Sequence, residues 1–201
     1  MIEIEKKFLL TPAQQERLLS GAEELGSKRV EDSYFDTADY RLTLGDYWLR
    51  LRDGAYELKA PLKTGSGAST TNRYNEITDI DEITRELGLP EDIDFDLALA
   101  QAGITRFITC HTDRISYEKQ GFHIDLDAVS YLDTDYKYAV AEIELLIDSE
   151  SEADAADQKI IEFAQGFDLS VDKVVLGKVL AYLQVEKPAH YNALAAARVI
   201  T

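Results

Sequence analysis

The sequence has little of what disulfide frameworks, cysteine metal sites and membrane spans require. Its 201 residues include one cysteine, Cys110, and four prolines. A single cysteine excludes an intramolecular disulfide and a multi-cysteine metal site. No apolar run approaches the about 18 residues of a membrane helix, so we expect no membrane association. The first residues are acidic where a signal peptide would be basic and then apolar, which predicts a cytoplasmic protein.

Positive charge is also scarce. The chain carries 21 basic and 38 acidic side chains, a formal net charge of −17. Because such a field repels polyanions, we expect no nucleic-acid partner. A phosphate-bearing substrate would require cations gathered locally. The length and the 45% hydrophobic content predict a single domain over residues 1–201 with a sizeable core. The expected state is a monomer or a homodimer, which length and composition do not decide between.

Helix signals are few and cluster toward the C-terminus. Thr11-Pro12 predicts a helix start and Gly26 its end, giving a helix over about 11–25. Further helices are expected near 80–88, 94–102, 151–167, 172–186 and 188–199. Residues 64–72 are rich in glycine, serine and threonine and predict a mobile loop. This loop is either an ordinary surface loop or the border of a substrate entrance.

The segment from Tyr47 to Ala60 predicts a β-hairpin around the two-residue turn Asp53-Gly54. Counting back from the turn pairs Arg52 with Ala55, Arg50 with Glu57 and Trp48 with Lys59. Side chains alternate between the faces of a strand. One face of this hairpin is therefore charged, apart from Trp48, and the other is apolar.

The same division recurs in other predicted strands. Their polar faces carry Glu3, Glu5 and Lys7; Tyr74, Glu76 and Thr78; Thr112, Arg114, Ser116 and Glu118; His123, Asp125 and Asp127; and Glu142 and Glu144. One interpretation is a solvated amphipathic sheet. However, like charges stand two residues apart on one face, and a solvated face would tend to mix them. This segregation favours a closed antiparallel barrel with a charged lumen and helices packed outside, an α+β fold.

Several of these motifs follow one another in a family-specific order. They are Glu3-Ile4-Glu5-Lys6-Lys7, Ser33-Tyr34-Phe35-Asp36-Thr37, Arg50 with Arg52, Glu57-Leu58-Lys59, Glu76, Arg114, Asp125-Leu126-Asp127, Glu142 with Glu144, and Lys178. Over about residues 1–185 the chain resembles the CYTH, or triphosphate tunnel metalloenzyme, superfamily. The stretch around Trp48 and the C-terminal segment are most similar to thiamine triphosphatases. The resemblance implies a tunnel of about eight antiparallel strands, open at both ends, with C-terminal helices over about 172–199.

The resemblance also implies roles for the charged residues. Metal ligands would be Glu3, Glu5, Asp125, Asp127, Glu142 and Glu144, holding Mg²⁺ or Mn²⁺. Asp127 could instead support a ligand or lie at the rim. Phosphate ligands would be Lys7, Arg50, Arg52, Lys59, Arg114 and Lys178. The alternative is that these six cations form salt bridges to the tunnel carboxylates.

We expect Arg52, Lys59 and Glu76 to take part in catalysis, with Glu76 orienting the attacking water or holding a second metal. Lys178 is expected on the apolar face of the helix over 172–186, beside a helical Gly177. Trp48 is the candidate specificity residue, because aromatic faces attract cationic rings such as a thiazolium. Its alternative role is packing at the barrel mouth.

The resulting expectation is a metal-dependent triphosphatase acting on thiamine triphosphate or inorganic triphosphate. The alternatives are an adenylyl cyclase of the same tunnel type and a tunnel that binds polyphosphate or nucleotide without turnover. The absence of a G-x-x-x-x-G-K-[ST] motif excludes a P-loop phosphatase. The three histidines, His111, His123 and His190, are expected to be structural or exposed, with His123 facing the charged side.

Overall fold

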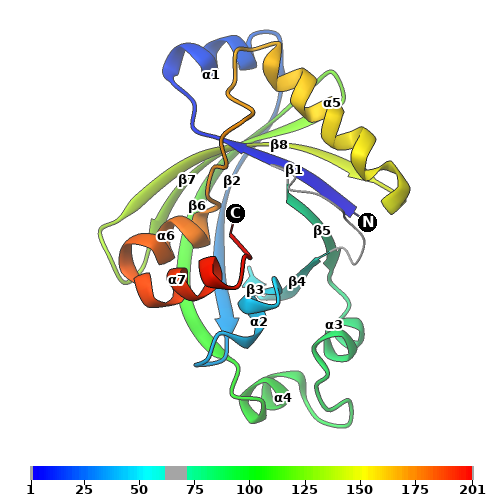
Figure 1. Ribbon diagram of the computed structural model, residues 1–201, viewed down its shortest axis with the longest axis vertical. Coiled ribbons are helices and arrows are strands. Elements are labelled where there is room, and N and C mark those ends of the chain that lie inside the picture. The colour runs from blue at the N-terminus through cyan, green and yellow to red at the C-terminus, as the bar shows by residue number, and fades with distance from the viewer. Residues whose placement is uncertain (1, 62–71, 201) are drawn as a thin grey trace.

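Eight antiparallel strands close into a barrel in the computed structural model, which describes residues 2–61 and 72–200 (Figure 1). The loop expected over 64–72 lies outside these residues except for its last position. The strands are β1 (Ile2–Phe8), β2 (Glu23–Asp36), β3 (Trp48–Arg52), β4 (Ala55–Pro61), β5 (Asn72–Ile77), β6 (Thr105–Lys119), β7 (Phe122–Tyr131) and β8 (Lys137–Ile147). Their order around the barrel is β1-β5-β4-β3-β2-β6-β7-β8, which confirms the predicted closed barrel.

The register of the β3–β4 hairpin is the one expected from its turn. Arg52 pairs with Ala55, Arg50 with Glu57, and Trp48 with Lys59. The side chains of the opposite face pack outward, and Leu49 and Leu58 are fully buried there. The alternation of polar and apolar residues thus directs charge into the lumen and apolar groups under the helices.

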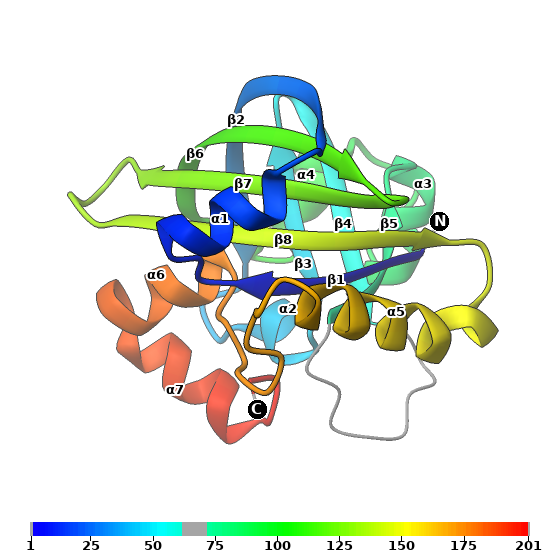
Figure 2. The ribbon, with the colours of Figure 1, turned by 90° about the horizontal axis from the view of Figure 1, so that it is seen from above.

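Helices cover much of the outer wall. They are α1 (Pro12–Leu19), α2 (Arg41–Leu44), α3 (Ile80–Leu87), α4 (Phe95–Gln101), α5 (Ala153–Gln165), α6 (Lys178–Glu186) and α7 (Pro188–Ala196), with a short 3₁₀ turn over Glu150–Glu152. Helix α5 runs along the outside of β1 and β8 (Figure 2). No helix of the described residues is long and apolar enough to cross a bilayer.

Helices α6 and α7 lie across one end of the barrel (Figures 1 and 2). There Val179, Tyr182 and Leu183 pack against Tyr34 and Cys110 of the barrel strands. The Cys110 thiol is fully buried in this cluster, and burial raises its pKa to about 11. One of the two expected openings is therefore covered by the C-terminal helices.

The first predicted helix ends earlier than expected. Thr11 caps it and Pro12 opens it as predicted, but it stops at Leu19. Gly21 then adopts a φ of +73°, and the chain turns into β2. Gly26 is not a helix stop: it lies within β2, at a shift in the register with β6. The first seven residues of β2 are exposed on both faces, so no apolar alternation marked them as a strand.

The helix expected over 172–186 begins only at Lys178. Gly177 is its N-cap, with φ −68° and ψ 163°, and not a residue inside the helix. The extended segment before it is held by a hydrogen bond of 2.7 Å from the Tyr138 hydroxyl to the Leu176 carbonyl. The expectation that Gly177 is helical, and that Lys178 lies inside a helix that begins at 172, is therefore wrong.

Candidate functional site

The lumen contains a cavity of about 330 Å³ with charged walls. Every residue for which the sequence predicted a catalytic, phosphate-binding or metal-binding role lines it: Glu3, Glu5, Lys7, Trp48, Arg50, Arg52, Lys59, Glu76, Arg114, Asp125, Asp127, Glu142, Glu144 and Lys178. The structure therefore brings together residues that are up to 175 positions apart in the sequence. Their individual roles remain predictions.

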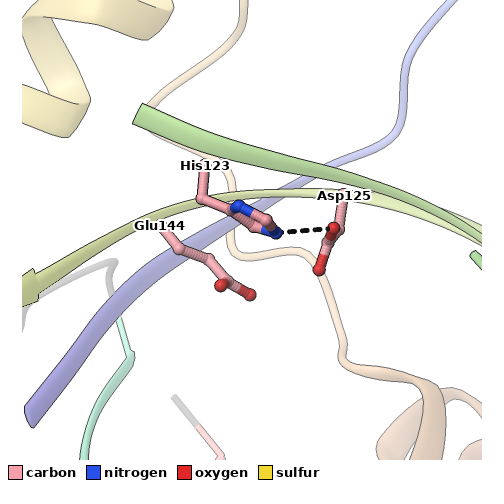
Figure 3. A group of neighbouring side chains, drawn as sticks. All are labelled: His123, Asp125 and Glu144. Carbon is pink, nitrogen blue, oxygen red and sulfur yellow. Dashed lines mark hydrogen bonds and ion pairs between the residues drawn. The ribbon is translucent and has the colours of Figure 1, made fainter. Parts of the chain in front are cut away.

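Carboxylates gather where β1, β7 and β8 meet. Glu144 of β8 is paired in register with Glu5 of β1 on one side and with His123 of β7 on the other. Two groups of ligand atoms, each within 4.8 Å, share Glu144: Glu3 with Glu5, and His123 with Asp125. Figure 3 shows the second group, in which His123 Nε2 lies 3.0 Å from Asp125 Oδ1.

Glu144 has no cationic or hydrogen-bonding partner among the described residues. Burial, together with the nearby charges of Glu3 and Glu142, raises its pKa well above the ordinary value. Burial likewise raises the pKa of Glu3 to about 6, although Lys59 opposes the shift. A set of oxygen ligands with excess negative charge is what a hard divalent cation requires. These residues therefore fit a divalent metal ion.

The other predicted metal ligands are bound to cations. The guanidinium of Arg114 donates to both oxygens of Asp127 at 2.6 Å, to Glu142 at 2.9 Å, and also contacts Asp125. Lys7 contacts Glu5 and lies 3.7 Å from Glu142. Burial opposes ionisation of Glu5, but Lys59 and Lys7 outweigh it and hold the Glu5 pKa well below its usual range.

The cations of the hairpin form a second group. Arg50 Nε donates to Glu57 at 2.7 Å, and Lys59 Nζ donates to Glu3 at 2.5 Å. Glu76 lies 3.4 Å from Arg50 and 3.6 Å from Lys59. Each predicted phosphate ligand thus contacts a carboxylate in the protein alone, as expected of buried cations without a bound anion.

Asp32 is the central residue that the sequence analysis missed. It is fully buried and accepts hydrogen bonds from Arg52 at 2.7 and 3.1 Å and from Lys178 at 2.5 Å. Burial opposes its ionisation, but Arg52 and Lys178 outweigh it and lower the Asp32 pKa. Strand alternation from Tyr34, whose neighbour in register is Arg50, could have identified it.

Lys178 reaches the lumen from the first position of α6. Its Nζ lies 2.5 Å from Asp32 and 3.1 Å from Thr112. The backbone of the preceding Gly177 lies close to Lys7, because a Cβ at Gly177 would stand 3.2 Å from Lys7 Cε. The beginning of α6 therefore contributes one cation to the cavity and packs against another.

The histidines differ in their surroundings. His190 is buried and its Nε2 lies 2.7 Å from Thr43 Oγ1, which gives it a structural position between α7 and α2. His111 contacts Glu31 at 2.8 Å, away from the cavity. His123 lines the cavity, in line with the face on which the sequence placed it, and its hydrogen bond to Asp125 raises its pKa.

The class of fold is a closed barrel whose lumen holds a cluster of carboxylates beside a cluster of lysine and arginine side chains. Comparison with known proteins gives the family. The family model for the CYTH domain matches residues 1–175, and the chain belongs to this family. Its members are in general metal-dependent. Thiamine-triphosphatases from Macaca fascicularis and Homo sapiens are 30% and 31% identical to it, over 96% of this chain and 89% of theirs.

Solved structures share the fold at lower identity. The PH1819 protein of Pyrococcus horikoshii aligns with a TM-score of 0.55 at 22% identity, covering 84% of this chain and 92% of that one. HpAC1 from Hippeastrum, described as having a dominant triphosphatase activity, aligns with a TM-score of 0.53 at 18% identity, covering 91% and 94%. These structures support the architecture of the barrel.

Proposed function

We propose that the protein is a metal-dependent triphosphatase that hydrolyses the terminal phosphoanhydride bond of thiamine triphosphate. The broader assignment, a triphosphatase hydrolase, rests on the CYTH family match and on the two thiamine-triphosphatases. The observation that carries the proposal is the cavity itself, in which seven cationic side chains face an acidic group that fits a divalent metal. A cytoplasmic location and a monomeric or homodimeric state are part of the same proposal.

The cations supply what a triphosphate needs. Arginine binds phosphate oxygens through two parallel hydrogen bonds, and lysine acts as a point charge. We assign Arg50, Arg52 and Lys59 of the hairpin to the phosphates, together with Lys7, Arg114 and Lys178. Bound phosphates would replace the carboxylates that these cations now contact.

The carboxylates of the cavity are suited to bind a divalent cation. Glu3, Glu5 and Glu144, with Asp125 and His123 beside them, would hold Mg²⁺. Asp127 and Glu142 are assigned to orienting Arg114, which both contact, and Glu142 is a further candidate ligand. A bound divalent ion neutralises phosphate charge and polarises the bond that breaks.

In the proposed reaction, water attacks the terminal phosphorus and the bond to the bridging oxygen breaks. The products are thiamine diphosphate and inorganic phosphate, and the water gives up one proton. Glu76, whose side chain is 36% exposed, lies within 3.6 Å of both Arg50 and Lys59 of the hairpin. We assign it to orienting the water and accepting that proton, while Arg52 and Lys59 stabilise the charge on the leaving diphosphate.

The test is phosphate release with Mg²⁺ from thiamine triphosphate, inorganic triphosphate and ATP, compared by kcat/KM. We expect thiamine triphosphate to be preferred, and Trp48→Ala to reduce that preference about 2- to 30-fold, the range of a cation–π contact. The matched control is Tyr47→Ala, which removes a neighbouring aromatic ring that hydrogen-bonds to Glu86 instead of lining the cavity.

The other substrates give distinct results. A preference for inorganic triphosphate would make the enzyme a tripolyphosphatase and leave Trp48 with a packing role. Release of diphosphate and cyclic AMP from ATP would identify a cyclase. Tight binding of metal and triphosphate without any product would identify a binding protein.

A further inference from the structure

Asp46 joins two aromatic residues at the wall of the cavity. Its Oδ1 accepts a hydrogen bond of 2.8 Å from Trp48 Nε1 and one of 2.9 Å from the Tyr74 hydroxyl. Both rings line the cavity, whereas Asp46 itself does not, so it holds them from behind. Trp48 belongs to β3 and Tyr74 to β5, and β4 runs between these strands. One carboxylate therefore fixes two rings that the sheet alone would leave independent.

The backbone is adapted to this arrangement. Asp46 has a φ of +61°, a left-handed conformation that aspartate and asparagine adopt more readily than other side chains with a Cβ. It lies between α2 and β3, where the chain enters the strand that carries Trp48. The conformation turns the carboxylate toward both rings.

Among the residues that the structure describes, no cation forms an ion pair with Asp46. Burial raises its pKa, and its only hydrogen-bond donors among the described residues are the neutral indole and phenol groups. Most carboxylates of the cavity wall contact an arginine or lysine directly. On the other side of this pair, Lys59 Nζ lies 5.9 Å from the centre of the Tyr74 ring.

We propose that Asp46 is a positioning residue that makes Trp48 and Tyr74 a receptor for a cationic ring. This inference rests on the proposed function and specifies its substrate class: a triphosphate ester whose organic part carries a fixed positive charge. An N–H or O–H group that donates to a carboxylate leaves its ring richer in electrons. A cation over that ring is then held more strongly, and more so in a partly desolvated site.

The position of the receptor agrees with this substrate. Lys59, a proposed phosphate ligand, lies next to Tyr74. The cationic ring would thus lie beside the phosphate chain, with the negative charge of Asp46 behind it. Inorganic triphosphate has no such ring and ATP carries a neutral one, so neither gains from Asp46.

The experiment compares Asp46→Asn and Asp46→Ala with the wild type. Asparagine keeps an acceptor oxygen and the left-handed backbone but removes the charge. Alanine removes both. The readout is the ratio of kcat/KM for thiamine triphosphate to kcat/KM for inorganic triphosphate. We expect this ratio to fall about threefold in the asparagine variant and about tenfold in the alanine variant, through KM for thiamine triphosphate.

Trp48→Phe and Tyr74→Phe keep each ring and remove its hydrogen bond to Asp46, and the same loss of preference is expected in smaller measure. Trp48 is the only tryptophan, so its fluorescence reports directly on this site. Titration with thiamine diphosphate should change the emission of the wild type at lower concentration than that of Asp46→Ala. This fluorescence titration requires no turnover. Normal activity of a variant on inorganic triphosphate shows that the variant is folded.

The outcomes separate the two proposals. A wild type that prefers thiamine triphosphate, with the same preference in Asp46→Ala, overturns the role of Asp46 alone. A wild type that hydrolyses inorganic triphosphate better overturns the thiamine assignment and, with it, the cationic-ring receptor. An equal loss on both substrates would show that Asp46 acts on the fold in general, which also contradicts the inference.

Discussion

Glu144 occupies the centre of the acidic group and shows how function and stability oppose each other at one residue. Its raised pKa means that ionised Glu144 destabilises the metal-free protein above the ordinary carboxyl pKa. Replacement with glutamine should therefore raise the free energy of unfolding without metal by about 1 kcal/mol or more. The same change should weaken Mn²⁺ binding and lower kcat/KM by about tenfold or more. Mutation of residues that only hydrogen-bond to metal ligands already costs about that much in affinity or activity.

Urea denaturation with and without Mn²⁺ and calorimetric metal titration would measure both effects. The control is Glu118→Gln, on an exposed position of β6 outside the acidic group. A Glu144→Gln variant that binds Mn²⁺ like the wild type would remove Glu144 from the proposed ligand set.

The pKa of Glu3, about 6, gives a pH dependence for metal binding. Below that pH the carboxyl holds a proton that a metal ion must displace, so the apparent affinity should fall as pH is lowered through 6. One displaced proton weakens affinity about tenfold for each pH unit below the pKa. Titration with Mn²⁺ at pH 5, 6 and 7.5 checks this, and Glu3→Gln should bind weakly with less dependence on pH. A wild-type affinity that stays constant over this range would contradict the prediction.

Among the elements, α6 connects its own stability to the geometry of the site. Its N-cap, Gly177, lies against Lys7. Gly177 has a φ of −68°, which any residue can adopt, so a substitution there is opposed only by the lack of space beside Lys7. Gly177→Ala should raise KM for triphosphates a few-fold by displacing Lys7. It should also destabilise the fold by about 0.5 to 1 kcal/mol, because alanine is a poor N-cap.

Gly177→Ser separates these two effects. Serine adds the same Cβ but is a good N-cap, so stability should be restored while KM stays raised. Steady-state kinetics and thermal unfolding of both variants give the comparison. If the serine variant had the wild-type KM, the contact with Lys7 would have no functional consequence.

The strands were predictable from the sequence where one face is charged and the other apolar. The hairpin register and the lumen positions of Arg50, Glu142 and Glu144 follow from alternation and from one Asp-Gly turn. The first half of β2 was not predictable in this way, because its first seven residues are all exposed and show no alternation of polar and apolar side chains. The start of α6 was not predictable either. Packing against the barrel makes Gly177 the N-cap, and the helix preference of the neighbouring residues does not. Asp32 was missed because its importance comes from Lys178, which is 146 residues away.

At the scale of the whole molecule, the barrel separates two distributions of charge. The cavity is nearly balanced, with seven cationic and eight acidic side chains in its wall. The formal charge of the chain is −17, so almost all of the excess lies outside this cavity. The fold thus places a local anion site inside a molecule whose mean field repels anions. Close pairing in the lumen makes this arrangement possible, since six of the seven cations contact a carboxylate of the described residues until substrate arrives.

This arrangement predicts that salt accelerates capture of the substrate. The outer charge acts over a long range and is screened within about 10 Å at 0.1 M ionic strength, whereas the buried contacts are screened much less. Raising KCl from 20 to 150 mM at constant free Mg²⁺ should therefore increase kcat/KM for inorganic triphosphate about two- to fivefold while kcat stays constant. Stopped-flow binding of the same anion should show the increase in the association rate. A kcat/KM that falls over this range would mean that the cations of the lumen dominate the field at the entrance, in spite of the net charge.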